Sequence, residues 1–151
     1  MLELATSADR AAVNALARQV HELHVSWRPD IFRSVEEIYP EERFLECIQA
    51  RQLYVAKLNG VPVGYILTKI KEYNIPSMQP RRIFVLEEIC VDESFRGHGI
   101  GTRIMEDFHA LARAFGCTDL ELGVHPENDD AVGFYQKCGF TIKSIHMQRK
   151  V

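Results

Sequence analysis

The stretch that decides the fold runs from Phe84 to Phe115 and reads FVLEEICVDESFRGHGIGTRIMEDFHALARAF. It opens with an apolar run, Phe84 to Val91, whose β-branched and aromatic residues predict a buried strand. The glycine-rich loop Arg96–Gly101 follows, and apolar residues then recur at i, i+3 and i+4 as far as Phe115, which is typical of a helix. Gly116 is placed to end that helix. The stretch therefore predicts a strand–loop–helix unit.

A glycine-rich turn that leads from a strand to a helix N-terminus is suited to bind an anion. Glycines let backbone N–H groups approach a phosphate, and the helix dipole favours negative charge there. Arg96 adds a cation, whereas the alternative interpretation is a tight turn that needs glycine only for packing. A P-loop would need a Lys after the glycines, and the dinucleotide fingerprint would need a glycine at Thr102. The pattern that fits is Arg-x-x-Gly-x-Gly, at Arg96, Gly99 and Gly101.

The composition bounds the rest of the chain. A length of 151 residues with 46% hydrophobic and 26% charged residues indicates one globular domain, 1–151. The net charge of −3 and the absence of a run of Lys or Arg do not favour nucleic-acid binding. No segment is apolar enough to be expected to act as a signal peptide or to span a membrane. The cysteines show no metal spacing, so we expect reduced thiols and a cytoplasmic location; they are Cys47, Cys90, Cys117 and Cys138.

Patterns outside the central stretch predict the order β-α-α-β-β-β-α-β-α-β. Asn59-Gly60 between two apolar runs is a strong hairpin signal. A final strand is expected over Phe140 to Met147, with a bulge near Lys143-Ser144 because the apolar residues change parity there. The chain should thus form a mixed sheet with helices packed on its faces. The other expected elements are a short strand at Leu2–Leu4, helices from Thr6 to Trp27, from Pro40 and from Asp129 to Cys138, and a strand over Leu120–Val124.

With its strand, the Arg96–Gly101 loop resembles motif A of the GNAT acetyltransferase superfamily, which binds the pyrophosphate of acetyl-CoA. A second block, Asn128 to Phe140, reads N-x-x-A-x-x-F-Y-x-x-x-G-F and is close to the second signature of that family. The resemblance implies an α/β (α+β) GNAT fold, with a mixed central sheet of six to seven strands and about four helices on its faces.

By the same resemblance, the expected activity is acetyl transfer from acetyl-CoA to a primary amine of a small molecule or peptide. Direct transfer is favoured, because no Cys or Ser is paired with a recognisable base. Two alternatives stay open: a GNAT-fold module that binds CoA without turnover, and a nucleotide-cofactor oxidoreductase. The acceptor and the oligomeric state are left open, a homodimer being one possibility.

Two neighbouring carboxylates, Glu87 and Glu88, are the candidate bases, because carboxylates in an apolar strand are costly to bury. Strict alternation would put them on opposite faces, and the resemblance favours Glu87 as the catalytic residue. The alternative is a structural ion pair, for example with Arg81 or Arg82. A carboxylate is about six pKa units short as a base for an ammonium, roughly 8 kcal/mol, so burial or a water chain must help.

Tyr135 is the candidate acid for the departing thiolate, since its phenol stays protonated at neutral pH. The alternative is a Phe134-Tyr135 pair that only packs in the core. No metal is expected, because His21-x-x-His24 has no third ligand. The resemblance implies cofactor contacts from Ile89, Cys90, Val91, Arg96, Gly97, His98, Gly99, Ile100, Gly101, Thr102, Asn128 and Tyr135. On the acceptor side we expect Glu88, His24, Trp27, Arg28, Asp30 and Phe32, together with the loop Tyr73–Pro80.

Overall fold

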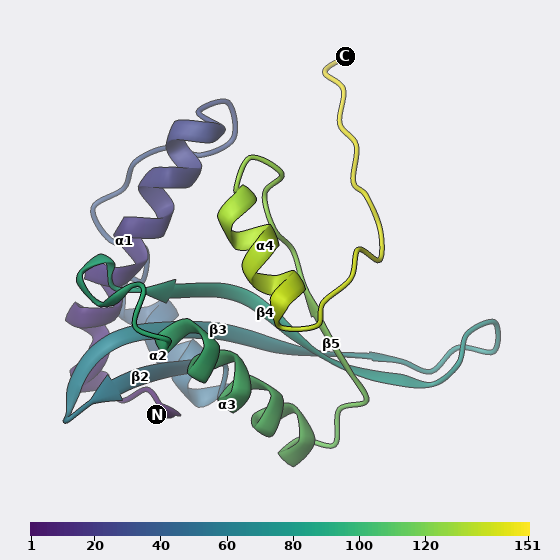
Figure 1. Ribbon diagram of the computed structural model, residues 1–151, viewed down its shortest axis with the longest axis horizontal. Coiled ribbons are helices and arrows are strands. Elements are labelled where there is room, and N and C mark those ends of the chain that lie inside the picture. Colours follow the sequence, from purple (N-terminus) through teal and green to yellow (C-terminus); the bar gives the residue numbers. More distant parts are fainter.

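The computed structural model describes residues 1–151 and contains one five-stranded sheet in the order β1-β2-β3-β4-β5 (Figure 1). The first four strands pair antiparallel, and β5 runs parallel to β4. Two short 3-10 turns, Ser7–Asp9 and Glu93–Phe95, precede α1 and the glycine loop. The elements are β1 (Leu2–Leu4), α1 (Arg10–Trp27), α2 (Glu41–Gln49), β2 (Leu53–Leu58), β3 (Val61–Tyr73), β4 (Arg81–Val91), α3 (Ile100–Ala114), β5 (Asp119–Leu122) and α4 (Asp129–Lys137).

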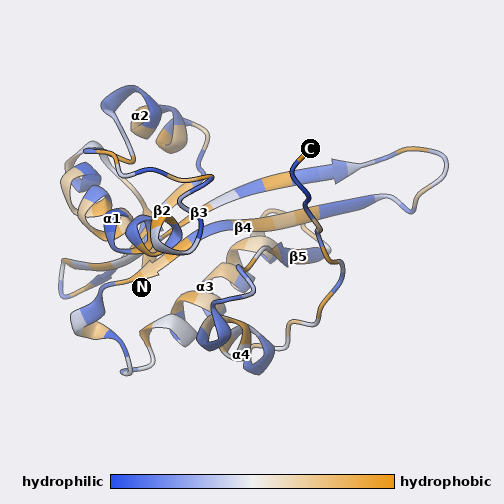
Figure 2. Cartoon of the chain, turned by 90° about the horizontal axis from the view of Figure 1, so that it is seen from above, coloured by the Kyte–Doolittle hydropathy of each residue, from blue (hydrophilic) through white to orange (hydrophobic).

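Helices cover both faces of the sheet, α1 and α2 on one and α3 and α4 on the other (Figure 2). The alternation of strand residues explains this, because successive side chains of a strand point to opposite faces. In β2, Leu53 and Val55 join the core below α1 and α2, whereas Tyr54 and Ala56 join the core below α3 and α4. The prediction of a mixed α/β sheet with four helices on its faces is therefore confirmed.

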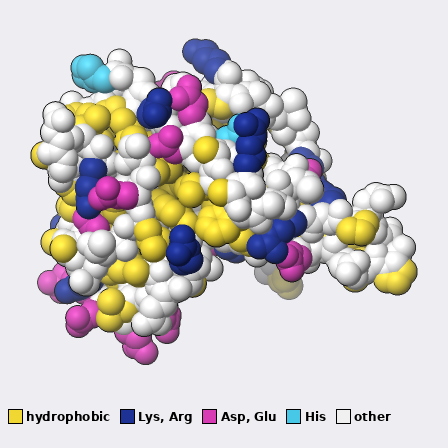
Figure 3. All heavy atoms as spheres, turned by 90° about the horizontal axis from the view of Figure 1, so that it is seen from below, with side chains coloured by type: hydrophobic (Ala, Val, Ile, Leu, Met, Phe, Trp, Pro, Cys, Tyr) yellow, Lys and Arg dark blue, Asp and Glu magenta, His cyan; other side chains and the backbone are white.

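Turn chemistry fixes two of the connections. Asn59 and Gly60 both have positive φ, 49° and 79°, as a two-residue hairpin turn requires. Gly116 ends α3 with a φ of 68°, as the sequence predicted. The long β3–β4 hairpin extends beyond the body of the molecule as an arm, with apolar side chains at its tip (Figures 1 and 3). The exposed large apolar residues there are Tyr73, Ile75 and Met78.

The predicted final strand is wrong, and so is the count of six to seven strands. Residues 138–151 contain no strand, and the chain after α4 runs as an extended segment, drawn in yellow in Figure 1. Its apolar residues have no sheet partner within this chain, so the pattern that predicted the strand is present but its pairing is not. None of the helices has the length and apolar character needed to cross a bilayer.

Candidate active site

The register between β3 and β4 contains the irregularity on which the site depends. Leu67 pairs with Glu88, but Thr68 pairs with Leu86, so Glu87 is an extra residue in β4. A bulge of this kind reverses the inward and outward faces of the strand beyond it. Leu86 consequently lies in the core below α3 and α4, whereas Glu88, two residues later, contacts side chains on the α1–α2 face.

The same part of β4 is unpaired on one side. The parallel pairing with β5 runs only from Ile83 with Asp119 to Leu86 with Leu122. Beyond Leu86, residues 88–91 pair with β3 alone and Glu87 has no register partner; we call residues 87–91 the open edge of β4. Apart from the carbonyl of Val91, which accepts a hydrogen bond from Arg96, the backbone groups there that point away from β3 have no strand partner and could bind an extended ligand in the manner of an added strand. The open edge contains Ile89, Cys90 and Val91.

The glycine loop lies at the end of the open edge. Gly97 and Gly99 both have a φ of 78°, and a Cβ built on either one would meet nothing within 4 Å. Packing therefore does not explain these two glycines, whereas a left-handed backbone beside open space does. Gly99 precedes α3, whose first N–H groups have no partner within the helix. The loop thus presents free donors at the positive end of a helix dipole.

Gly101 has a different reason to be glycine. It lies inside α3, and a Cβ there would come within 3.3 Å of the Phe134 ring on α4. Arg96 turns back toward the strand, and its Nε donates a hydrogen bond of 2.9 Å to the carbonyl of Val91. This bond fixes the loop to the end of β4. His98 contacts the loop backbone through Nδ1, 2.9 Å from the carbonyl oxygen of Arg96, and Thr102 lies exposed in the first turn of α3.

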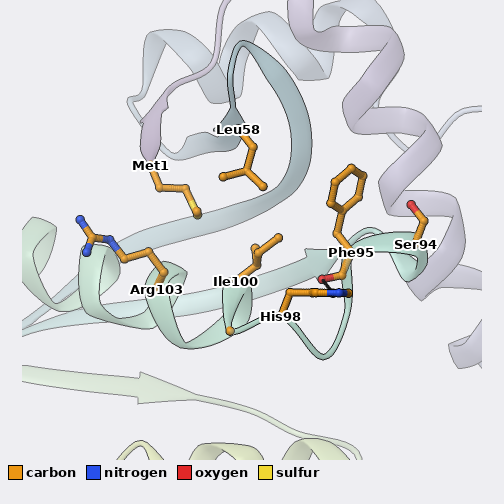
Figure 4. Close-up of a pocket in the computed structure, with 8 residues that line it drawn as sticks. Met1, Leu58, Ser94, Phe95, His98, Ile100 and Arg103 are labelled. Carbon is orange, nitrogen blue, oxygen red and sulfur yellow. Dashed lines mark hydrogen bonds between the residues drawn. The ribbon is translucent and has the colours of Figure 1, made fainter.

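A hollow of about 480 Å³ adjoins the loop on the side facing the β1–β2 edge of the sheet (Figure 4). Met1 and Leu58 face Ile100 across it, and His98 and Arg103 supply its polar part. None of residues 87–91 lines this hollow, so it is separate from the open edge of β4.

The two candidate carboxylates have different surroundings. Glu87 is exposed and forms an ion pair with Lys69 of β3. Glu88 accepts hydrogen bonds from two phenols, Tyr39 at 2.5 Å and Tyr65 at 2.8 Å, both to Oε2. Burial, followed by the nearby Glu88 charge, raises the pKa of both phenols, so both remain protonated donors. Neither carboxylate pairs with Arg81 or Arg82; these arginines bind acidic groups on β3 and β5.

Tyr135 lies buried on α4, between the rings of Phe134 and Phe140. Burial raises the pKa of its phenol to about 12. Its hydroxyl has no hydrogen-bond partner in the protein, although it is not among the fully enclosed polar atoms. Asn128 caps the same helix, because its Oδ1 accepts a hydrogen bond of 3.2 Å from the backbone N–H of Ala131.

Aromatic side chains gather where α1 ends. The ring of His24 lies 5.8 Å from that of Trp27 and 5.5 Å from that of Phe32. Trp27 stacks on His125, which follows β5, with 5.2 Å between the ring centroids. We call His24, Trp27, Phe32 and His125 the aromatic wall. Burial lowers the pKa of His24, as do the neighbouring His125 and His21, while the Glu88 charge acts in the opposite direction, so the environment favours the neutral imidazole.

The structure brings together three of the predicted acceptor-side residues, His24, Trp27 and Phe32. Arg28 lies beside them and makes a two-point ion pair with Asp30 that lowers the pKa of that carboxyl to about 2. The loop Tyr73–Pro80 is not at this wall; it forms the tip of the β3–β4 arm (Figure 1). His125, Tyr39 and Tyr65 were given no role from the sequence, because no local spacing links them to the residues that they contact.

These features define an α/β domain with a glycine-rich loop before a helix N-terminus and an unpaired strand edge. The sequence matches the model of the Acetyltransferase (GNAT) family over residues 17–140, and the chain belongs to that family. An uncharacterized N-acetyltransferase of Methanocaldococcus jannaschii is 35% identical over 92 residues. The match covers 61% of this chain but 40% of that relative, so it spans less than half of the relative's length.

Solved structures show the same fold. A tetramutant of the BH1408 protein from Bacillus halodurans superposes with a TM-score of 0.93 at 31% identity, over 100% of this chain and 99% of that one. Aminoglycoside N-acetyltransferase AAC(6')-Iy, in a structure with CoA, gives a TM-score of 0.74 at 19% identity, over 99% and 93% of the chains. The prediction of a GNAT fold is confirmed. No group of three or more His, Cys, Asp and Glu side chains is arranged to hold a metal ion.

Proposed function

We propose that this protein is an acetyl-CoA-dependent N-acetyltransferase that transfers the acetyl group directly to the primary amine of a small molecule or peptide. The observation that carries the proposal is the continuity of the open edge of β4 with the glycine loop. This arrangement offers strand-like backbone donors for an extended arm and a helix N-terminus for a pyrophosphate. The family relation and the N-acetyltransferase relative support the same activity.

The residues present fit acetyl-CoA. Gly97 and Gly99 leave free space where a phosphate would approach, and α3 begins with unpaired N–H groups. Acetyl-CoA supplies an activated thioester when bound. The protein would hold its pyrophosphate with the loop from Arg96 to Thr102, and its pantetheine arm with backbone groups of Ile89, Cys90 and Val91. Asn128 and Tyr135 would border the same ligand from α4.

We assign the base to Glu88 in preference to Glu87. Lys69 already neutralises Glu87, which is exposed, whereas Glu88 lies half-buried below α1 and α2. Tyr39 and Tyr65 fix the Glu88 carboxylate through one oxygen, Oε2, and no protein group hydrogen-bonds the other oxygen, Oε1. Oε1 can therefore receive a proton from a bound ammonium, directly or through a water molecule.

Tyr135 would donate to the departing sulfur. A phenol with a pKa of about 12 lies about 3.5 units above a free thiol, so complete proton transfer would be uphill by roughly 5 kcal/mol. The favoured role is a hydrogen bond to the developing thiolate, which requires no complete transfer in the protein. The aromatic wall would border the acceptor, because His24 is close enough to Glu88 for the carboxylate charge to affect its pKa.

The experiment is an acceptor panel with two readouts. The protein is mixed with acetyl-CoA and, separately, with amino sugars, polyamines, amino acids and short peptides. Free CoA is measured with a thiol reagent, against a blank without acetyl-CoA because Cys117 and Cys138 are partly exposed. Mass spectrometry of the acceptor then tests for an added acetyl group. Acetylation of a primary amine supports the proposal, and acetyl-CoA binding without product from any acceptor contradicts it.

A further inference from the structure

A second hollow, of about 530 Å³, lies beside the aromatic wall, and most of its lining is polar. His125 belongs to both, because it lines the hollow and its ring stacks on Trp27. The other polar side chains come from two parts of the sequence, the end of α1 with the turn after it and the C-terminal segment 141–151. They are Arg28, Asp30, His146, Gln148 and Lys150.

Contacts within this chain hold the two parts of the lining together. Arg28 donates a hydrogen bond of 2.8 Å from Nη2 to Oε1 of Gln148, which fixes the C-terminal segment to the end of α1. Lys143, earlier in the same segment, forms an ion pair with Glu121 of β5. The hollow therefore forms in a single copy of the protein.

The charges of the lining do not cancel. Asp30 is the one acidic residue among the lining residues, and Arg28 already neutralises it through two hydrogen bonds of 2.9 and 2.8 Å. Glu127 is close enough to raise the pKa of Arg28, but it does not line the hollow. The Lys150 ammonium makes no ion pair within 4.0 Å, so the hollow keeps a positive charge although the chain has a net charge of −3.

The histidines add hydrogen-bond donors to this charge. Nδ1 of His125 accepts a hydrogen bond of 3.2 Å from the backbone N–H of Glu127, so the neutral ring carries its proton on Nε2. No group of the protein accepts a hydrogen bond from that Nε2, and His146 makes no hydrogen bond at all. Donors without partners beside an unpaired ammonium are what a phosphate or carboxylate would satisfy.

The hollow is connected to the proposed base by a short row of rings. His125 lies 5.2 Å from Trp27, and Trp27 lies 5.8 Å from His24, whose pKa the Glu88 charge affects. One small molecule can therefore reach from Glu88 to the hollow. We infer that the acceptor carries an anionic group, a phosphate or a carboxylate, which binds in this hollow while the amine lies at Glu88. The inference rests on the proposed N-acetyltransferase function, and it disfavours polyamines as acceptors.

The test uses four probes that share the same amine and carbon chain: aminohexyl phosphate, aminohexanoate, aminohexanamide and aminohexanol. Binding is followed by the fluorescence of Trp27, the only tryptophan of the chain, because its ring stacks on His125 in the lining. The preferred anionic probe should bind about ten- to a hundredfold more tightly than the neutral probes, as expected for a hydrogen-bonded charge. Comparison of the phosphate with the carboxylate identifies the anion. With acetyl-CoA present, kcat/KM should show the same preference.

Substitutions of two neighbouring residues locate the anion. Lys150→Glu should abolish the preference for anionic probes, because it replaces the unpaired cation of the lining with a negative charge. Lys150→Arg should retain the preference. Arg149→Glu is the matched control, since it makes the same change of charge at an exposed residue that does not line the hollow, and it should leave the preference intact.

The outcomes separate this inference from the proposed function. Acetylation of anionic and neutral probes with equal kcat/KM would overturn the inference and leave the proposed function in place. Tight binding of an anionic probe without acetylation of any acceptor would contradict the proposed function, and the hollow would remain an anion site. A preference that survives Lys150→Glu would also overturn the inference, because the anion would then bind elsewhere, for example at the glycine loop.

Discussion

Tyr39 and Glu88 lie 49 residues apart in the sequence, yet the phenol of Tyr39 donates a hydrogen bond of 2.5 Å to the Glu88 carboxylate. Tyr39 precedes α2 and is fully buried, and its backbone N–H is itself held by the side chain of Asn14 on α1. The carboxylate is thus positioned by two segments that only the folded chain brings together. This relationship leads to the first prediction.

Glu88→Gln should lower turnover and weaken binding of cationic acceptors together, because in the proposed mechanism one carboxylate would serve both as base and as counter-charge. A loss of about a hundredfold in kcat/KM is in the range of general base catalysis. The alkaline-rising limb of the pH–rate profile should disappear. Glu87→Gln is the matched control, since it removes the neighbouring charge from an exposed ion pair, and it should leave that limb in place. Loss of that limb in Glu87→Gln, with the limb retained in Glu88→Gln, would identify Glu87 as the base instead.

Tyr135→Phe should reduce turnover by about ten- to a thousandfold while the affinity for acetyl-CoA changes little. The substitution keeps the ring between Phe134 and Phe140 and removes only the hydroxyl. Tyr54→Phe provides the control, because Tyr54 carries a buried hydroxyl without a hydrogen-bond partner. Steady-state kinetics and calorimetry measure the two quantities. Undiminished turnover in Tyr135→Phe would mean that the Tyr135 hydroxyl does not stabilise the departing thiolate.

Gly99→Val should abolish tight acetyl-CoA binding, because a valine disfavours the φ of 78° and fills the space that an anion would approach. Gly60→Val carries a similar strain, since Gly60 has a φ of 79° and equally open surroundings, but it lies in the β2–β3 hairpin. Both variants should lose similar stability, and only the first should lose affinity by calorimetry. Equal affinities for acetyl-CoA in Gly99→Val and Gly60→Val would show that the glycine loop is not part of the cofactor site.

Asp9→Asn should lower the free energy of unfolding at pH 7, and this loss should be smaller at acidic pH. Burial alone would raise the pKa of Asp9, but hydrogen bonds from the Thr6 backbone and side chain and from Lys57 outweigh it, and the net pKa is lowered. A lowered folded-state pKa contributes stability that is present above the unfolded value, near 3.9, and is lost as the pH falls through the folded value.

The difference in unfolding free energy between wild type and Asp9→Asn should therefore be constant from pH 7 to about 4.5 and narrow below about 4. Its size at pH 7 should be on the order of 1–3 kcal/mol, as for a hydrogen bond to a charged group. Urea titrations at several pH values measure it. A difference that grows on acidification would contradict the assignment of Asp9 as an ionised anchor.

The sequence predicted what depends on neighbouring residues. The positive φ at Gly60 and the end of α3 at Gly116 follow from local chemistry, and both are present. The face on which Glu88 lies could not be derived in this way, since a bulge is defined by the register against β3 and not by β4 alone.

The remaining differences have the same origin. Strand periodicity was visible in Phe140–Met147, but periodicity states only that a segment is suited to pairing, and pairing needs a partner. His125 stacks on Trp27 because the end of α1 and the loop after β5 meet across the sheet. No residue spacing in the sequence indicates the contact between Trp27 and His125.

The open edge of β4 limits which functions of this protein can be lost by substitution during evolution. Every amino acid except proline carries the same backbone N–H, so almost any substitution at residues 87–91 leaves those donors in place. The aromatic wall is made of side chains, and each of its four members can be replaced singly. Under the proposed function, substitutions in the aromatic wall would change the preferred acceptor while the backbone groups that would hold the acyl donor stay in place.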